Sequence, residues 1–260
     1  MNPALNNCWH ADGYDKLKPY GFPIHGCIDG YSRRVMWLDI VRSNNDPRVV
    51  GKLYYNCITS SKFGPTILTT HRGTENGIMA SAPCFLRRNH TDSLSGDKAH
   101  RYGSLHMNQR MEAWWSLLRK SWSSWWINFF KDLIARGILD TSNTLHLECL
   151  WFCFSPVLKK ELEEIKKSWN CHYVRKSRYY TQAGIPNRLF LLPETVGASD
   201  CNKEYNEQDL FEIEDTLNVS IENDSENLEY FSYSAGVLGL GQTQTWRQAL
   251  AAYDKIIQAA

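Results

Sequence analysis

The chain has 260 residues, of which 43% are hydrophobic and 13% aromatic, with a formal net charge of +1. These values exclude an intrinsically disordered chain, and the absence of about 20 consecutive apolar residues and of a secretory signal predicts an intracellular protein without a membrane partner. The charge is uneven: residues 1–197 contain 26 Lys and Arg against 16 Asp and Glu, a balance of +10, whereas residues 198–260 contain 3 against 12, a balance of −9.

The first part of the chain predicts strands. Three β-rich segments separated by turns with Gly and Pro indicate a three-stranded meander: residues 7–12, 22–29 and 34–41. A helix is expected over residues 48–60, because Asp46 suits its N-cap and Pro47 its first position.

A strand and a second helix are expected next. Residues 66–70 form a short β-rich segment, and residues 74–87 predict a helix that is interrupted near Pro83. Residues 92–99 are polar and indicate a loop. The order strand, strand, strand, helix, strand, helix is typical of an α/β fold.

The middle of the chain predicts helices. Residues 107–139 form a long amphipathic region dense in aromatic side chains: Trp114, Trp115, Trp122, Trp125, Trp126, Phe129 and Phe130. Aromatic residues at this density more often form core or a helix-packing interface than a base-stacking surface. We therefore expect a stiff bundle behind the sheet or a face for a homo-oligomer. Residues 141–169 predict a further helix, apolar at first and charged after Pro156.

The last third changes in composition. Residues 198–229 are acidic and polar and predict a flexible stretch, whereas residues 246–257 predict a short amphipathic helix. The eight cysteines include no C-x-x-C pair, which favours reduced core thiols over a structural zinc site. Cys149 and Cys153 lie one helical turn apart and could approach Cys171 and His172, but their aromatic neighbours favour a buried helix.

Three ordered motifs carry a resemblance to a known family. They are Trp9-His10-Ala11-Asp12-Gly13, Thr70-His71-Arg72-Gly73-Thr74-Glu75-Asn76 and the segment from His100 to Arg119. They resemble the active-site motifs of DDE-type integrase cores, in particular those of animal genes derived from mobile elements. The resemblance covers roughly residues 7–195. It implies an RNase H-like α/β fold, with a mixed sheet of about five strands flanked by helices and an added C-terminal helical region.

The resemblance and the change in composition after residue 197 together predict three regions. Residues 1–145 would form the catalytic-core-like domain, residues 146–197 a helical extension with the basic tail of the core, and residues 198–260 an acidic, partly flexible tail with a short terminal helix.

The resemblance assigns the catalytic positions to Asp12, His71 and Glu112, and the metal-ligand positions to Asp12 and Glu112. The family uses Mg²⁺ or Mn²⁺ as a pair of ions about 3.5–4 Å apart, which need oxygen ligands. His71 stands where the family has Asp. An imidazole suits transition metals better than magnesium, and the substitution removes a negative charge, so we expect weakened metal binding.

Other acidic residues are weaker candidates. Asp15 and Glu75 are near enough in sequence to reach the same cleft, but neither occupies a ligand position of the family. Asp29 is expected to be a strand-turn residue rather than a metal ligand. The resemblance and the basic character of residues 1–197 together predict a DNA-binding surface, against the alternative of simple solvent exposure. Its candidate residues are Arg72, Asn76, Gln109, Arg119, Lys120, Arg175, Lys176 and Arg178.

Three functions are compatible with these features. The first is a nucleic-acid-binding protein with an integrase-like core of mobile-element origin, nuclear rather than cytoplasmic, and impaired in DNA strand transfer because of His71. The second is an active metal-dependent integrase, transposase or nuclease. The third is a scaffold without a nucleic-acid role that dimerises through its Trp-rich helices.

Overall fold

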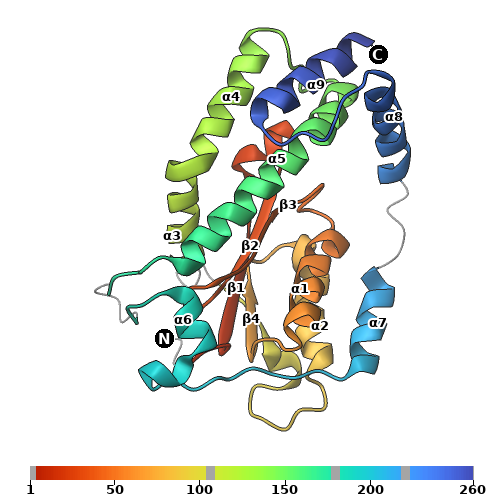
Figure 1. Cartoon of the computed structure of the whole chain (residues 1–260). Helices are drawn as coiled ribbons and strands as arrows, with labels where there is room; N and C mark the ends of the chain where they lie inside the picture. The colour runs from red at the N-terminus through yellow and green to blue at the C-terminus, as the bar shows by residue number, and fades with distance from the viewer. Residues whose placement is uncertain (1–3, 104–108, 177–181, 218–222, 260) are drawn as a thin grey trace.

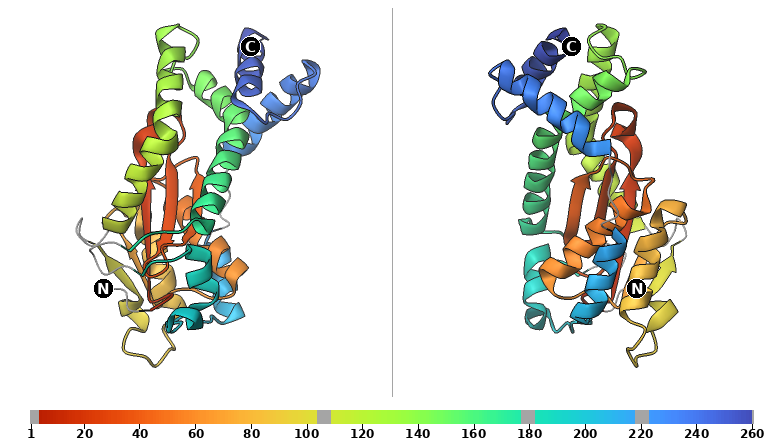
Figure 2. Two further views of the ribbon diagram at one scale, coloured as in Figure 1. Left: turned by 60° about the vertical axis from the view of Figure 1, so that its left-hand side comes forward. Right: turned by 90° about the vertical axis from the view of Figure 1, so that its right-hand side faces the viewer.

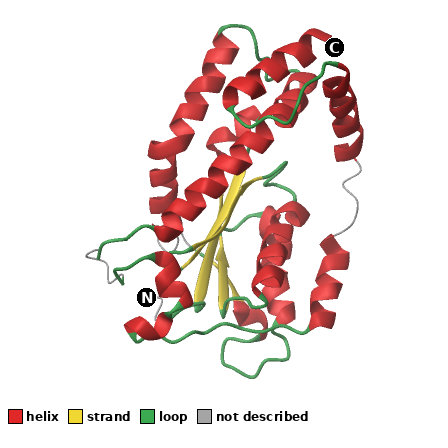
Figure 3. Cartoon of the chain, in the orientation of Figure 1, coloured by secondary structure: helices red, strands yellow, loops and turns green. Residues whose placement is uncertain are grey.

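The computed structural model describes residues 4–103, 109–176, 182–217 and 223–259. Its centre is a mixed sheet of order β3-β2-β1-β4-β5 (Figures 1 and 3). The strands are β1 (Cys8–Tyr14), β2 (Ile24–Asp29), β3 (Val35–Ile40), β4 (Ile67–Thr70) and β5 (His100–Tyr102). The first three form the antiparallel meander that the sequence predicts, and β4 and β5 run parallel to β1. This arrangement confirms the expected RNase H-like fold.

One face of the sheet is covered by α1 (Pro47–Ser61) and α2 (Gly77–Leu86). The Asp46 carboxylate accepts a hydrogen bond from the Arg48 backbone N–H at 2.9 Å, which confirms the predicted N-cap and the start at Pro47. The predicted interruption near Pro83 is wrong, because α2 continues through this residue to Leu86. Pro83 removes one N–H donor close to the end of the helix, and its buried ring packs in the core, so the helix tolerates it.

A third helix on this face, α7 (Glu207–Leu217), comes from the acidic region and was not predicted. Its apolar side, Ile213 and Leu217, is buried with residues of α1 and the sheet. Asp209 also accepts a hydrogen bond from the Arg88 guanidinium at 2.8 Å. Within the described part of the acidic region, α7 is therefore an ordered part of the core. It was not predicted because the many acidic residues on its exposed side dominate its composition.

The other face of the sheet is covered by helices that extend past its end (Figures 1 and 2). The chain passes from α3 (Gln109–Leu118) through a π-helical turn (Arg119–Ser123) into α4 (Ser124–Ala135), and returns along the sheet in α5 (Thr144–Cys171). The predicted helix over residues 107–139 is too long at its end, because Gly137 adopts a left-handed conformation with φ 70° after α4. The helices α8 (Asn223–Val237) and α9 (Trp246–Ala259) pack against α5.

The Trp-rich helices mainly form core. Trp114, Trp115, Trp122 and Trp126 are buried, and the indole N–H groups of Trp122 and Trp126 both donate to Glu161 of α5, at 2.7 and 2.9 Å. Trp125 is 47% exposed and stacks on Phe129. Most of the aromatic series is therefore used inside the chain, and oligomerisation through these helices stays a prediction.

The segment between α6 (Pro186–Leu191) and α7 crosses the lower part of the molecule in Figure 1 and contacts the beginning of the chain. Asp200 forms a backbone bridge with Leu5 and accepts a hydrogen bond from the Asn6 amide at 2.8 Å. Lys203 forms a second bridge, with Gly64. These contacts anchor the region that precedes α7 on the core. No helix among the described residues is long and apolar enough to cross a membrane.

Candidate functional site

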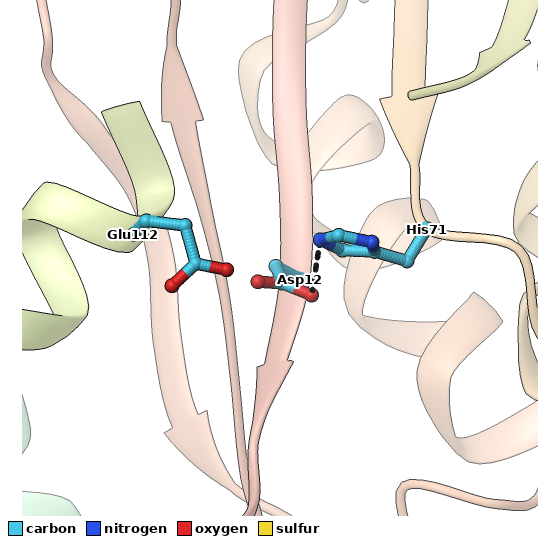
Figure 4. A group of neighbouring side chains, drawn as sticks. All are labelled: Asp12, His71 and Glu112. Atoms are coloured by element: carbon cyan, nitrogen blue, oxygen red, sulfur yellow. Dashed lines mark ion pairs between the residues drawn. The ribbon is translucent and has the colours of Figure 1, made fainter. Parts of the chain in front are cut away.

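Two parallel strands and one helix bring the three motif residues together (Figure 4). Asp12 lies on β1, and His71 directly follows β4, the parallel neighbour of β1. Glu112 lies in the first turn of α3. One ligand atom from each of these three side chains lies within 4.8 Å of the other two. Residues far apart in sequence therefore form one compact group, although their catalytic and metal-binding roles stay predictions.

Asp12 is the centre of this group. Its Oδ1 atom lies 3.6 Å from Nε2 of His71, and Glu112 approaches it from the opposite side (Figure 4). The Asp12 side chain is only 12% exposed, whereas that of His71 is 27% exposed. Glu112 is exposed, so Asp12 is the most enclosed of the three donors.

Trp115 lies within the third motif, but the resemblance assigned it no role in the site. Its indole N–H donates to Oδ2 of Asp12 at 3.0 Å, and its ring lies 5.1 Å from that of Tyr14, centroid to centroid. Trp115 follows Glu112 by three residues, so both side chains lie on one face of α3. This spacing was the one sequence signal that could have placed Trp115 beside Glu112. The density of aromatic residues instead favoured a position in the core.

The surroundings of Asp12 disfavour its ionised form. Burial raises the pKa of Asp12 from 3.8 to about 6; the charge of His71 and the hydrogen bond from Trp115 lower it, while the charge of Glu112 raises it. The metal-free protein therefore keeps a proton on Asp12 in a pH range where an unfolded chain has lost it.

This difference predicts a pH-dependent effect of Asp12→Asn. The folded-state pKa of Asp12 exceeds the unfolded-state value, so the folded state binds more protons between these values and stability falls as pH rises through them. Asn cannot ionise and avoids this loss. In chelator, we expect Asp12→Asn to be more stable than the unmodified chain by about 2 kcal/mol near pH 7. The difference should shrink towards about pH 5, as measured by urea unfolding.

A matched control is Asp215→Asn on the exposed side of α7, which changes the same group without a buried environment. Its effect on the free energy of unfolding should be small at both pH values. An effect of Asp12→Asn that is the same at both values would contradict the proposed origin in burial.

The segment after His71 is held by Asn76. The buried Asn76 amide donates to the His71 carbonyl at 3.1 Å and to the Glu75 carboxylate at 2.9 Å. In this conformation the Asn76 amide is used inside the protein and fixes the turn that follows β4. Its contact with nucleic acid stays a prediction.

The remaining acidic candidates have other partners. Asp15 pairs with Lys18 at 3.4 Å. Glu75 accepts from Asn76, and neither Asp15 nor Glu75 belongs to the group around Asp12. Asp29 is fully buried and accepts hydrogen bonds from the Asn6, Tyr31 and Ser32 backbone N–H groups, which confirms its predicted place as a strand-turn residue.

The donor set decides which metal the site suits. It offers two carboxylates and one imidazole, whereas a pair of magnesium ions requires oxygen ligands and enough negative charge to balance two dications. No third carboxylate of the described residues joins the group. The residues present therefore do not fit the magnesium pair that the resemblance implies.

The predicted nucleic-acid contacts lie on several different elements. Arg72 is exposed next to His71, and Arg119 and Lys120 are exposed after α3. Burial raises the pKa of the Tyr14 hydroxyl, and the nearby positive charge of Arg119 lowers it. Arg119 therefore lies near β1. The other exposed pair is Arg175 and Lys176, after α5. Arg178 and the side chain of Gln109 lie outside the described residues.

Comparison with known families agrees with the geometry. Residues 2–194 match the model of a family described as an integrase core domain. No curated protein matches the chain.

Proposed function

The chain belongs to the integrase core domain family, and we propose from this premise that it is a nucleic-acid-binding protein of mobile-element origin with impaired DNA strand transfer. The observation that carries the proposal is the position of His71, whose Nε2 atom lies 3.6 Å from Asp12 in the group where the family has a second Asp. The fold that positions the site is retained, and one ligand of the site has changed.

The change affects the divalent metal ions that this family uses. When bound, such ions activate the attacking oxygen and stabilise the leaving oxygen in phosphoryl transfer. Asp12 and Glu112 are the residues suited to hold a cation, but His71 adds no negative charge when neutral. If His71 is protonated, its charge opposes a cation directly. Neither the neutral nor the protonated form of His71 favours the binding of two dications at this site. This supports the proposal that DNA strand transfer is impaired.

Binding of nucleic acid does not depend on that chemistry. Exposed cations on both sides of the site, Arg72 on the β4 side and Arg119 with Lys120 on the helix side, are suited to phosphate groups. The surplus of Lys and Arg in residues 1–197 supports the same role. A surface of this kind binds the backbone mainly through charge and releases counterions when it does so.

The test is a charge reversal at the helix side of the site. We expect the double variant Arg119→Glu plus Lys120→Glu to bind a short DNA duplex at least about tenfold more weakly at low salt. The slope of log affinity against log salt should fall by about 1–2, because one or two phosphate contacts are lost. Fluorescence anisotropy over a salt series measures both quantities.

The matched control reverses two cations away from the site, with Lys131→Glu near the end of α4 and Lys255→Glu on α9. It changes the net charge by the same amount and should leave the salt slope unchanged. Equal losses in the two double variants would mean that only total charge matters. Binding that is independent of salt in the unmodified chain would sink the nucleic-acid proposal and favour the scaffold function.

An active enzyme is the second candidate, favoured by the compact grouping of Asp12, His71 and Glu112 within 4.8 Å. Such an enzyme would use a metal that accepts an imidazole ligand, such as manganese. Cleavage of DNA by the unmodified chain, lost on Glu112→Gln, would distinguish it from the binding protein.

A further inference from the structure

Both oxygens of Asp12 already have neighbours within the protein. Oδ1 faces the imidazole of His71 at 3.6 Å, and Oδ2 accepts a hydrogen bond from the indole N–H of Trp115 at 3.0 Å. A carboxylate that bridges two cations presents one oxygen to each of them. On the Oδ2 side a second cation would compete with the N–H group, whose hydrogen carries a partial positive charge.

The position of Trp115 is fixed by packing. Its side chain is only 5% exposed, and its ring lies against Tyr14 and over the backbone of Gly26 on β2. A Cβ atom at Gly26 would lie 2.9 Å from Cη2 of Trp115, so the absence of a side chain there allows the ring to approach the sheet. Gly26 is also the partner of Asp12 in the β1–β2 register. The same strand pair therefore places both the acceptor and the donor.

From these contacts, we propose that the Asp12, His71 and Glu112 group is a site for one divalent transition-metal ion, with Trp115 as a positioning residue that weakens binding of a second ion at Asp12. The inference rests on the proposed function, in that it concerns the same site, but it adds a metal class, a number of ions and Trp115, a residue to which the motifs assign no role.

The donor chemistry selects the metal class. Two carboxylates and one imidazole form a mixed oxygen and nitrogen set, which suits Mn²⁺ or Zn²⁺ better than Mg²⁺. The 4.8 Å limit on the distances between ligand atoms brings all three within reach of a common ion after small side-chain movements. One dication balances the two carboxylates, whereas two dications would leave a surplus of positive charge.

Titration with Mn²⁺, followed by electron paramagnetic resonance, tests the number of ions. The unmodified chain should bind one Mn²⁺ and show no signal from a spin-coupled pair, and Mg²⁺ should compete weakly. His71→Asp should bind a second ion weakly. The double variant His71→Asp plus Trp115→Phe should bind that second ion about tenfold more tightly than His71→Asp alone, because one charge-assisted hydrogen bond to Asp12 is gone.

Trp114→Phe is the matched control. Trp114 is buried on the same helix, but its ring packs on Trp169. In the described part of the chain, the indole N–H that donates to Asp12 is that of Trp115. Combined with His71→Asp, it should leave the affinity for the second ion unchanged. A second ion that binds equally well with and without Trp115 would overturn the positioning role.

A measurement on the unmodified chain avoids any loss of folding in the variants. In a titration with Zn²⁺, the nuclear magnetic resonance signal of the Trp115 indole N–H should shift with a one-to-one end point while that of Trp114 moves little. No shift of the Trp115 signal at saturating Zn²⁺, or no binding of Zn²⁺, would overturn the inference.

The outcomes separate this inference from the proposed function. Two spin-coupled Mn²⁺ ions in an unmodified chain that does not cleave DNA would remove the inference and leave the proposed function intact. One Mn²⁺ ion in an unmodified chain that cleaves DNA would do the reverse.

Discussion

His71→Asp is expected to give the chain Mg²⁺-dependent DNA nicking and strand joining on the order of 10²-fold above that of the unmodified chain, a change of about 2.7 kcal/mol in the activation barrier. The substitution returns an oxygen ligand to a position beside Asp12, where His71 now lies at 3.6 Å. It also adds the negative charge that a second dication requires. The strands that position residues 12 and 71 are unchanged by a substitution at the end of β4, so the site geometry should persist.

The measurement is a gel assay of nicking and joining on short DNA duplexes, with Mg²⁺ as the metal. The double variant His71→Asp plus Glu112→Gln should lose the activity while it retains DNA binding, because the proposed role of Glu112 is to hold a metal ion and not to bind DNA. If His71→Asp is folded and binds DNA but remains inactive in Mg²⁺, then His71 is not what limits the chemistry.

Phe130→Ala is expected to lower the free energy of unfolding by about 3–5 kcal/mol, the range for truncation of a buried aromatic residue. Phe130 is fully buried and connects three parts of the molecule. Its ring packs on Tyr20 and Phe22 near the sheet, on Trp126 of α4 and on Phe154 of α5. Loss of the ring leaves a cavity where α4 and α5 meet the sheet, and these long helices cannot collapse into it independently.

Urea unfolding measures this effect, and Ile134→Ala on the same helix is the control. Ile134 is 40% exposed, and its truncation should cost less than about 1.5 kcal/mol. Similar costs for both substitutions would show that the aromatic cluster is not the main source of stability at this junction. Loss of Phe130 should also reduce DNA binding only in proportion to the unfolded fraction, because the residue lies in the core.

The fold was largely predictable because its strongest local signals agree with the tertiary structure. The meander and the capped α1 follow from strand patterns, turn residues and the Asp46-Pro47 pair. The short β5 was missed because a three-residue strand of sequence His-Arg-Tyr has no periodicity to detect. The helix α7 was missed because most of its residues are acidic or polar. Its two buried apolar residues indicate a core position only once their packing against α1 is known.

The site was predictable at its motif positions and not beyond them. Asp12, His71 and Glu112 were proposed from the order of the motifs, and their proximity depends on the parallel pairing of β1 with β4, which the structure shows. The raised pKa of Asp12 depends on its burial, and the hydrogen bond from Trp115 depends on the approach of the indole ring over Gly26. Neither can be deduced from the local sequence. The hydrogen bond from the Asn76 amide to the His71 carbonyl likewise could not be predicted from the spacing of the residues.

The most direct test of impaired strand transfer is one assay on the unmodified chain in which DNA binding and DNA cleavage are measured in the same samples, with Mg²⁺ and then with Mn²⁺, beside Glu112→Gln. If strand transfer is impaired, both proteins should bind DNA in a salt-sensitive manner, and in Mg²⁺ the unmodified chain should cleave no more DNA than Glu112→Gln. Mg²⁺-dependent cleavage by the unmodified chain that disappears in Glu112→Gln would contradict it, because His71 would then be a working ligand of an active enzyme.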